Sequence, residues 1–530
     1  MSFGHIDRRT FLEAVAAGAA AAAHASPSTG AVVHALPAAN DRRILLKTSF
    51  AEPQARPPRL EIGKRRVAGV RGDTAGLFWS FDARGLEPET PYTLRLTDSA
   101  GRPLDSAWTL RTFPDPSARP KQLRVLVYTC AGGNDALLDG AGAPRALSLD
   151  RRRRLLRRGL SFRPDAVIAN GDHVYWDLLS RPAPRWGASA AAEKFAGKFD
   201  RSAPALGTPN EAVLLRAAGP QIAPLYGKLF RATPVFFVSD DHDYFDNDDA
   251  DDNLVTFPPD PFMLALGRAT RRLYYPEFLP DPNRPAGLLG ASAPDSPPQT
   301  AECFGTLRWG RLAEILMYDC RRGMRLDGAS AVFVPRETEQ WLRARMADRG
   351  VAHVVNVPST PPGWSAGKWG EWYPDVLESP GVIGTKEPKP FWQTGWLRQH
   401  DRILSAAAAG RRRPIFFNGD LHSIAEGTIY RSGSADLRNN PAFTLVTGPL
   451  GTGRGWPSGG RGTRGQHSTV LDMKETLPCI EENGFVLADF TPEKVVVRFF
   501  RWKPAEGEAA IDKLEPFRTT ELPRRGAAGS

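Results

Sequence analysis

The pattern of apolar and polar residues changes near residue 120 of the chain. Before that point, from about residue 43 to residue 113, short runs alternate apolar with polar side chains, most clearly at residues 77–81, 92–96 and 108–113. Alternation with a period of two is typical of strands that have one buried face. We therefore expect a small β-sandwich domain over residues 42–115, joined to the rest by the proline-rich stretch 114–120.

The turn between the first two of these runs has the sequence Gly85-Leu86-Glu87-Pro88-Glu89-Thr90-Pro91-Tyr92. This segment resembles the tyrosine-corner turn of fibronectin type III domains and related sandwiches. The resemblance implies a fibronectin III-like or immunoglobulin-like arrangement of strands in the first domain.

Beyond residue 120 the apolar residues form continuous runs separated by longer helical or loop segments. Strands buried on both faces have this pattern, because neither face needs polar side chains. The runs lie at residues 123–128, 166–169, 234–238, 313–318, 353–357, 414–417 and 443–446. Residues 151–160 and 337–349 are predicted helices, and residues 485–490 and 495–502 are predicted closing strands. We expect an α/β domain over residues 120–505, followed by a polar, arginine-rich tail over residues 506–530.

The composition is that of a globular protein, with 41% hydrophobic and 24% charged residues among 530. The net charge is +10, but the basic residues form short runs, as at residues 151–154 and 411–413, without interleaved aromatic side chains. Nucleic-acid-binding surfaces combine the two, so we expect no nucleic-acid-specific binding and interpret these runs as solvated helix faces. The four cysteines are too few for a disulfide framework, and whether Cys303 pairs with Cys320 stays open.

The N-terminus resembles a twin-arginine export signal. The pair Arg8-Arg9 precedes a stretch of small residues, 14–23, that is too short to span a bilayer. Ala23-His24-Ala25 and Val33-His34-Ala35 are two candidate cleavage sites, and we assign residues 1–35 to the signal peptide. The protein is therefore expected in the periplasm or outside the cell, with the twin-arginine translocase as its partner during export.

Polar side chains follow four of the buried runs at the point where each predicted strand ends. In α/β sheets, ligands bind in the crevice beyond the carboxyl ends of the strands. The side chains here are carboxylates, imidazoles, a thiol and a phenol, all of which bind metals. They are Cys130 after 123–128, Asp172 and Tyr175 after 166–169, Asp241 and His242 after 234–238, and Asp420 and His422 after 414–417. We therefore expect a metal site, and a pair of metal ions suits in-line displacement at phosphorus, with an imidazole protonating the leaving group.

Three sequence motifs occur at these strand ends. They are Gly171-Asp172-His173-Val174-Tyr175, Asp240-Asp241-His242-Asp243 and Gly419-Asp420-Leu421-His422, in that order. The motifs resemble those of the calcineurin-like metallophosphoesterase superfamily, and specifically those of PhoD-like phosphatases, the alkaline phosphatase D family. The resemblance covers most of the chain, including the leading sandwich, the export signal, Cys130 and residues 307–310, 319–321 and 340–342. It implies that residues 120–505 form an αββα sandwich that carries the catalytic site.

The resemblance also implies a centre that holds ferric iron together with one or two calcium ions. Iron would be held by Cys130, Asp172, Tyr175 and His422, and calcium by Asp172, Asp241 and Asp420. Thiolate and phenolate groups suit a trivalent, Lewis-acidic iron, whereas positions with oxygen ligands alone suit calcium.

Further residue roles follow from the same resemblance. His242 is expected to be the general acid. Asn356 is expected to supply another metal-binding oxygen, although a turn residue at a strand end explains it equally well. Arg321 is expected either to hold a phosphate oxygen with two hydrogen bonds or to form a salt bridge with Asp319.

The sequence departs from the family pattern in three places. They are Ser239 where tryptophan is usual, Asp243 where glutamate is commoner, and Asn247-Asp248 where two asparagines are usual. These departures leave the subfamily and the natural substrate open.

The function expected from the sequence is an exported, metal-dependent phosphoric ester hydrolase, a phosphomonoesterase or phosphodiesterase of the alkaline phosphatase D type. Metal-bound hydroxide would attack phosphorus at neutral to alkaline pH, and His242 would protonate the leaving group. The expected substrate is a small phosphate ester, a phospholipid or a phosphorylated polymer, and the chain is expected to act as a monomer. Two alternatives stay open: a phospholipase D-like phosphodiesterase, and a non-catalytic secreted binding protein on a degenerate esterase fold.

Overall fold

The structure is a computed structural model. It describes residues 31–134, 144, 146–176, 195–244, 259–276, 305–324, 331, 332, 334–365, 376–379, 382–384, 394–451, 465–467 and 471–525. The twin-arginine motif, Cys303 and Asn247-Asp248 lie outside these residues. Within them, no helix has both the length and the apolar character needed to cross a membrane. Cys320 is a free, buried thiol.

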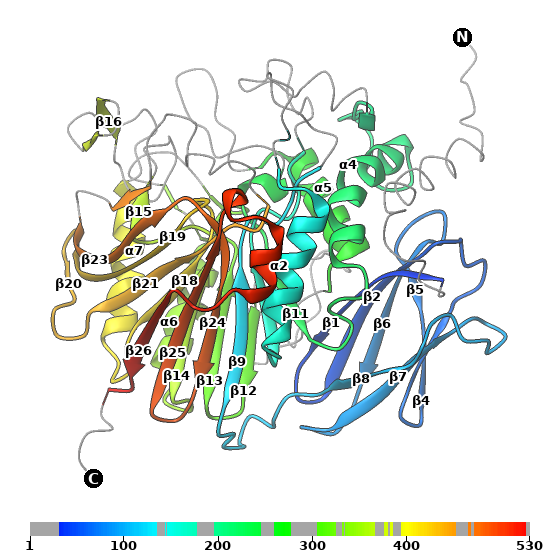
Figure 1. The fold of residues 1–530 in the computed structure, drawn as a ribbon, viewed down its shortest axis with the longest axis horizontal. Coiled ribbons are helices and arrows are strands. Elements are labelled where there is room, and N and C mark those ends of the chain that lie inside the picture. Colours follow the sequence, from blue (N-terminus) through cyan, green and yellow to red (C-terminus); the bar gives the residue numbers. More distant parts are fainter. Residues whose placement is uncertain are drawn as a thin grey trace.

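The N-terminal domain consists of two four-stranded antiparallel sheets, as the alternating runs predict (Figure 1). One sheet has the order β1(Val32–Ala39), β2(Arg43–Phe50), β6(Phe78–Arg84), β5(Val70–Arg71). The other has the order β4(Arg65–Ala68), β3(Arg59–Ile62), β7(Pro91–Thr97), β8(Trp108–Arg111). Leu60 and Leu94 of the second sheet share a buried apolar cluster with Leu46 and Phe81 of the first. The period-two pattern thus supplies the core of a sandwich.

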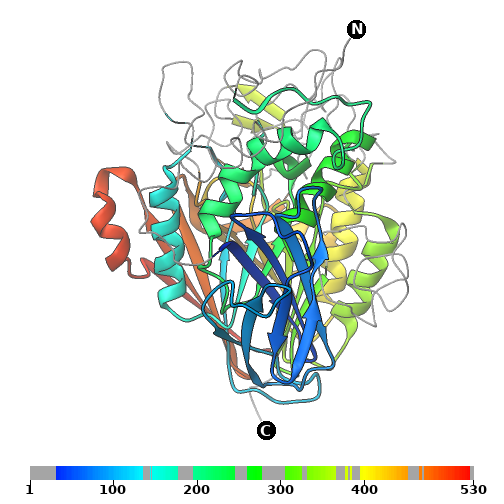
Figure 2. The same cartoon turned by 90° about the vertical axis from the view of Figure 1, so that its right-hand side faces the viewer.

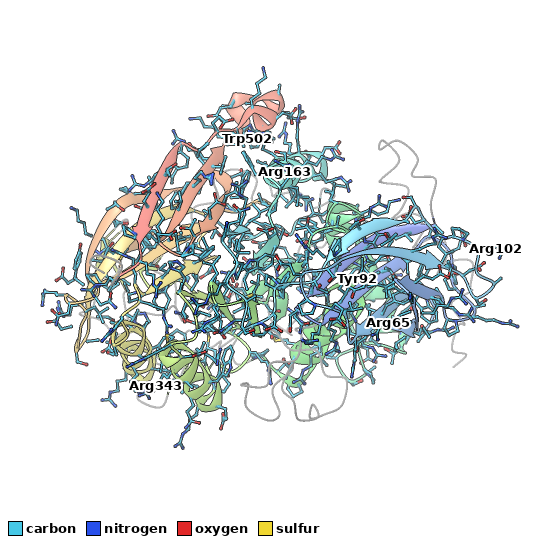
Figure 3. The ribbon with its side chains drawn as sticks, turned by 90° about the horizontal axis from the view of Figure 1, so that it is seen from below. Arg65, Tyr92, Arg102, Arg163, Arg343 and Trp502 are labelled. Carbon is cyan, nitrogen blue, oxygen red and sulfur yellow. The ribbon has the colours of Figure 1, made fainter. Side chains whose placement is uncertain are left out.

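The turn before β7 has the geometry that its sequence resembles. The hydroxyl of Tyr92 accepts a hydrogen bond of 2.8 Å from the backbone N–H of Glu87, five residues upstream. Figure 3 shows Tyr92 within the sandwich. A tyrosine hydroxyl bonded to upstream backbone is the tyrosine-corner arrangement of such sandwiches.

The first strand limits where a signal peptide can end. β1 begins at Val32, inside the stretch that the sequence assigns to the signal, and it pairs with β2 over most of its length. Ala35 and His34 are fully buried in this strand. Cleavage after Ala25 leaves β1 intact, whereas cleavage after Ala35 would remove half of it.

The second domain contains two mixed sheets whose strands match the continuous apolar runs. The first has six strands, in the order β11(Val235–Val238), β10(Ala166–Asn170), β9(Leu123–Tyr128), β24(Asn483–Phe490), β25(Lys494–Trp502), β26(Arg518–Pro523). The second has eight, in the order β12(Gly305–Trp309), β13(Ala313–Tyr318), β14(His353–Pro358), β18(Ile415–Asn418), β21(Ala442–Thr447), β19(Ile424–Ser432), β20(Ala435–Asp436), with β23(Leu471–Ile480) paired to β19. β9, β10 and β11 run parallel, as do β13, β14, β18 and β21.

Helices cover the outer faces of both sheets, so the αββα arrangement is confirmed (Figures 1 and 2). Leu126 of β9 packs in one cluster with residues of α2(Leu149–Ser161), α4(Pro209–Tyr226) and α5(Pro261–Tyr274). Leu316 of β13 packs with residues of α6(Arg336–Ala347) and α7(Thr394–Ala408). Val127 and Val355 belong instead to the cluster between the sheets. Arg343 on α6 points away from the sheets (Figure 3).

Residues 506–525 of the segment predicted as a C-terminal tail pack against the second domain and contribute a short helix and a strand to it. A short helix, η4(Glu508–Lys513), lies against α2, where Arg154 pairs with Asp512 and Arg151 with Glu508 at 2.8 Å. β26 then adds an antiparallel edge strand to β25. Leu522 is the only buried apolar side chain of this strand, so the sequence gives little apolar signal, because one face of an edge strand remains in solvent.

Polar contacts join the sandwich to the second domain. His34 Nε2 lies 2.9 Å from the carbonyl oxygen of Tyr274, and Lys47 Nζ donates to the carbonyl of Arg272 at 2.8 Å. The hydroxyl of Thr74 donates to Glu211 on α4 at 2.7 Å. The two domains therefore contact each other directly, and Figure 2 shows the sandwich lying across the second domain.

Candidate metal centre

The candidate ligands lie in loops that follow strands of both sheets. Thr129, at the end of β9, ties these loops together: its hydroxyl donates to the carbonyl of Asn170 at 2.6 Å and accepts from the backbone N–H of Asp420 at 3.4 Å. Asn170 in turn donates from Nδ2 to the carbonyl of Pro358 at 3.0 Å, which connects β10 to β14. The strand ends of the two sheets therefore meet at one place.

Four of the ligand-bearing residues have a left-handed backbone. The φ angles are 48° at Cys130, 56° at Asp172, 69° at Asp420 and 44° at His422. Such angles are uncommon outside glycine and cost on the order of 1–3 kcal/mol each, and they cluster at functional sites. Gly419 fits the same crowding, because a Cβ there would collide with the Asn170 carbonyl and with Thr129. The Gly-Asp motifs are thus required by close packing of the loops.

The first cluster brings together the four residues predicted to hold iron. The Sγ atom of Cys130 lies 3.3 Å from Oδ2 of Asp172, and the hydroxyl of Tyr175 lies 3.0 Å from the same oxygen. The same hydroxyl is 3.0 Å from Nε2 of His422, which is itself 3.8 Å from Asp172 Oδ2. These donors converge on a volume that one cation would fill.

Two further clusters adjoin the first. Asp172, Asp241 and His242 offer ligand atoms within 4.8 Å of one another, and so do Asp240, Asp241 and Asp420. Asp172 belongs to two clusters and Asp241 to two, so these carboxylates are placed to bridge neighbouring cations. All four carboxylates are buried.

Several of these carboxylate oxygens have no hydrogen-bond partner in the described structure. They are Oδ1 of Asp172, Oδ2 of Asp240 and both oxygens of Asp241. A buried polar atom without a partner is strongly unfavourable, and buried charges are normally paired or bound to metal. The residues present therefore fit bound cations.

The pKa shifts of the candidate ligands also favour bound cations. Burial raises the pKa of Asp240 and of Asp241 well above the usual value, and neighbouring carboxylates add to the shift. Burial and the charge of Asp172 likewise raise the pKa of the Cys130 thiol and of the Tyr175 phenol. Burial also opposes ionisation of Asp172, but His242 and His422 outweigh it and hold its pKa far below the usual range. Thiolate and phenolate forms here require a cation, so metal binding would release protons.

The structure does not bring Asn356 to the clusters. This residue lies inside β14, two positions before the strand ends, on the face that packs against α6. Its Nδ2 contacts Sδ of Met346 at 3.7 Å. A metal-binding role for Asn356 would require the strand to end near this residue, but β14 continues to Pro358.

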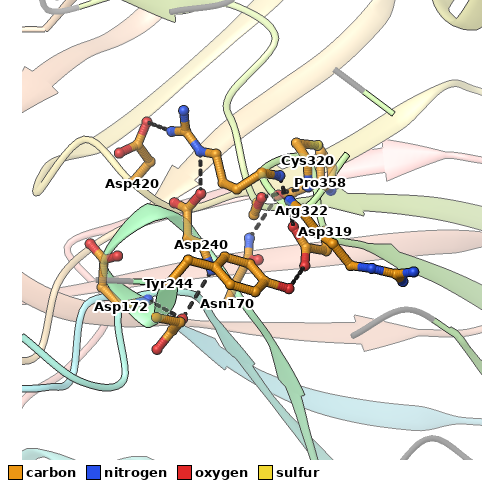
Figure 4. Close-up of polar contacts among 12 residues, drawn as sticks. Asn170, Asp172, Asp240, Tyr244, Asp319, Cys320, Arg322, Pro358 and Asp420 are labelled. Carbon is orange, nitrogen blue, oxygen red and sulfur yellow. Dashed lines mark hydrogen bonds and ion pairs between the residues drawn. The ribbon is translucent and has the colours of Figure 1, made fainter. Parts of the chain in front are cut away.

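Arg321 lies at the centre, but with partners that the sequence does not indicate. Its side chain is completely buried, and it donates from Nε to Asp240 at 2.6 Å and from Nη2 to Asp420 at 3.0 Å. Asp319, its expected partner, accepts instead from the backbone N–H groups of Arg321 and Arg322, at 2.7 and 3.0 Å. Figure 4 shows Asp240 and Asp420 on one side of this loop and Asp319 and Arg322 on the other.

Two supporting residues complete the centre. Asp243 accepts hydrogen bonds from the backbone N–H groups of Asp172, His173 and Asp240, at 3.0, 2.9 and 2.9 Å. Gln221 of α4 accepts from the N–H of Tyr175 at 2.9 Å and donates to its carbonyl at 2.8 Å. The sequence signals Asp243 only as a departure from a family pattern, and gives no signal for Gln221.

Comparisons with known proteins agree with this geometry. No known family profile and no curated protein matches the sequence. The solved structure of PhoD matches with a TM-score of 0.58 and 14% identity, over 96% of this chain and 94% of that one. Purple acid phosphatase PPD1 from seeds of yellow lupin, Lupinus luteus, matches with a TM-score of 0.56 and 11% identity, over 94% of this chain and 75% of that one. Similarity at these identities establishes the fold. The chain therefore has the metallophosphoesterase-like fold of PhoD, with buried candidate metal-binding groups at the ends of its strands.

Proposed function

We propose that this protein is a metal-dependent phosphoric ester hydrolase that cleaves phosphomonoesters or phosphodiesters. One observation carries the proposal: Asp172 lies in two adjoining clusters of buried ligand atoms, at the strand ends of a PhoD-like fold. Adjacent cations that share a carboxylate suit in-line displacement at phosphorus.

The donor sets suggest which cations bind. The sulfur, phenol, imidazole and carboxylate around Asp172 suit ferric iron, held by Cys130, Asp172, Tyr175 and His422. The oxygens of Asp172, Asp241 and Asp420, which belong to the two clusters that share Asp241, suit calcium. When bound, these cations lower the pKa of water and neutralise charge that develops on the phosphoryl oxygens.

His242 is the residue proposed to move a proton. Its ring lies 4.4 Å from the ring of Tyr175, and both side chains are half-buried while the surrounding carboxylates are buried. The imidazole is therefore less buried than the carboxylates of the ligand cluster that it adjoins. From there it can donate the proton of a ring nitrogen to the leaving oxygen of an ester.

Export belongs to the same proposal. The twin-arginine motif supports a periplasmic or secreted location and passage through the twin-arginine translocase. Cleavage after Ala25 is supported because the first strand, β1, begins at Val32 and would remain intact. We further propose that the exported chain acts as a monomer.

The test measures hydrolysis of p-nitrophenyl phosphate and bis(p-nitrophenyl) phosphate together with metal content. Asp172→Asn should lose bound metal and at least about 100-fold in kcat, because even residues beyond the ligands cost about 10–100-fold at metal sites. Asp98→Asn, in a sandwich turn, serves as the control and should retain both. Turnover that is unaffected by a chelator and by Asp172→Asn would overturn the proposal.

The two alternatives give different results in the same experiments. A phospholipase D-like enzyme would release the head group from phosphatidylcholine. A binding protein on a degenerate fold would be folded, bind a phosphorylated polymer and never cleave it. The first cluster, with all four of its predicted ligands in contact, supports catalysis over the second alternative.

A further inference from the structure

The acidic cluster formed by Asp240, Asp241 and Asp420 contains a cation that belongs to the chain itself. Three buried carboxylates with ligand atoms within 4.8 Å of one another would ordinarily fit a divalent metal ion. The guanidinium of Arg321 already contacts two of the three, Asp240 Oδ1 at 2.6 Å and Asp420 Oδ2 at 3.0 Å.

The guanidinium is held in place by the loop that carries it. Asp319 accepts from the N–H groups of Arg321 and Arg322, and the N–H of Cys320 donates to the hydroxyl of Ser359 at 3.0 Å. The hydroxyl of Tyr244 also bonds to Asp319, at 2.5 Å (Figure 4). Arg321 has no solvent-exposed surface, so its charge stays next to the two carboxylates.

The charges of the centre balance when Arg321 is included. Among the residues that the structure describes, six acidic side chains line it: Cys130, Asp172, Tyr175, Asp240, Asp241 and Asp420. When all six are ionised, a trivalent and a divalent cation together neutralise five negative charges. The guanidinium matches the sixth. Asp243 is outside this set, because its oxygens accept from backbone N–H groups.

The hydrogen bonds separate the carboxylate oxygens into those that bind Arg321 and those that have no hydrogen-bond partner. Arg321 takes Oδ1 of Asp240 and Oδ2 of Asp420. Oδ2 of Asp240 and both oxygens of Asp241 have no hydrogen-bond partner. The second group of oxygens, together with Asp172, is enough for one further cation beside the one at Cys130.

We propose that Arg321 is a built-in cation that occupies the place of a third metal ion, so that the centre holds two metal ions per chain. The inference rests on the proposed metal centre. It predicts that removing the guanidinium leaves two buried carboxylates that a further divalent ion will bind, because a buried charge without a partner is strongly unfavourable.

The experiment counts metal ions per folded chain. Wild type, Arg321→Met and Arg321→Lys are each purified without chelators, equilibrated with calcium, and analysed by elemental mass spectrometry and by equilibrium binding of radioactive calcium. Wild type and Arg321→Lys should hold two metal ions, and Arg321→Met three. Adding Asp240→Asn to Arg321→Met should abolish the gain.

Arg322→Met is the matched control. It lies on the same loop, but Figure 4 shows its side chain on the far side of Asp319 from Asp240 and Asp420. Its metal count should equal that of wild type. Circular dichroism and thermal unfolding establish that each variant is folded.

A folded Arg321→Met protein with the wild-type count would overturn the inference, since protons would then replace the guanidinium. If Arg321→Met does not fold, the number of metal ions bound per wild-type chain tests the inference by itself. Two metal ions would support the inference, whereas three or none would overturn it. Hydrolysis is measured separately. Two metal ions without any turnover would remove the proposed function and leave the role of Arg321 standing.

Discussion

Side chains that hydrogen-bond to the backbone of the loops control the geometry of the candidate metal ligands. The carboxylate of Asp243 receives N–H groups from the loop after β10, at Asp172 and His173, and from the loop after β11, at Asp240. A single side chain thus sets the distance between two loops that carry candidate ligands. Ionised carboxylates are strong acceptors of such hydrogen bonds.

We expect Asp243→Asn to weaken metal binding. The amide offers one acceptor oxygen where the carboxylate has two, and its NH₂ group faces backbone donors. Metal affinity should fall about 10–100-fold, the usual range for residues that position ligands. Competition with a fluorescent chelator measures the affinity, and Asp243→Glu, which keeps the charge, should recover part of it. Equal affinity in wild type and Asp243→Asn would contradict this role.

Gln221 should act on Tyr175 in a way that light absorption can report. Its amide bonds to both the N–H and the carbonyl of Tyr175. Gln221→Leu removes both bonds, so the phenolate-to-iron charge-transfer band of the loaded protein should weaken or shift. Gln399→Leu changes another buried glutamine, which lies on α7 and donates to the carbonyl of Val334 just before α6, and it should leave the band intact. An unchanged band in Gln221→Leu would exclude a positioning role.

The sequence indicates the candidate ligands more clearly than it indicates the residues that position them. Cys130, Asp172 and Asp420 each follow a buried strand, and parallel strands bring their ends to one edge. Gln221 comes from the middle of α4, and only the packing of that helix brings it to Tyr175. Arg321 was expected at the site, but the choice of Asp240 over Asp319 depends on a loop conformation that no motif encodes.

At the scale of secondary-structure elements, strands whose side chains are buried on both faces could be predicted from the sequence. The run 123–128 coincides with β9, and the run 313–318 with β13. α4 could not be predicted, because Pro220 and Pro224 lie inside it and proline normally interrupts a helix. Its buried surroundings outweigh this local preference.

The folded C-terminus should contribute measurably to stability. Removing residues 506–530 exposes the edge of β25 and breaks the pairs between η4 and α2, such as Arg154 with Asp512. An uncovered edge strand also promotes association between chains. We expect a lower Tm by several degrees, roughly 2–4 °C per kcal/mol lost, together with increased light scattering on heating. Removal of residues 526–530 alone is the control, and an equal Tm for both truncations would contradict the expectation.

At the scale of the whole molecule, the contact between the two domains includes the buried side chain of His34, which is neutral at pH 7. Burial lowers the pKa of His34 from 6.5 to about 4. Between these pH values the unfolded chain binds a proton that the folded protein excludes, so stability falls as the pH drops through this range. At about 1.4 kcal/mol per pKa unit, the loss approaches roughly 3 kcal/mol below pH 4.

Replacing His34 should remove this part of the acid sensitivity. His34→Gln keeps a donor for the carbonyl of Tyr274 but cannot take up the proton. The difference in unfolding free energy between pH 7 and pH 4.5, measured with urea, should be smaller than in wild type. His467→Gln, at a partly exposed position on β22(Gln466–His467), should keep the wild-type difference. A steeper loss in His34→Gln than in wild type would count against the interpretation.

Cys130 and Asp420 lie 290 residues apart in the sequence, but Sγ of Cys130 is 3.7 Å from the carbonyl oxygen of Asp420. The candidate metal centre therefore cannot form until both residues have been synthesised. β9 also lacks one neighbour until β24, starting at Asn483, has been made. A nascent polypeptide still on the ribosome therefore has no complete cage for an ion until synthesis is almost finished. If the proposed centre binds metal, loading is a late step of biogenesis, and prematurely terminated products lack part of the candidate ligand set.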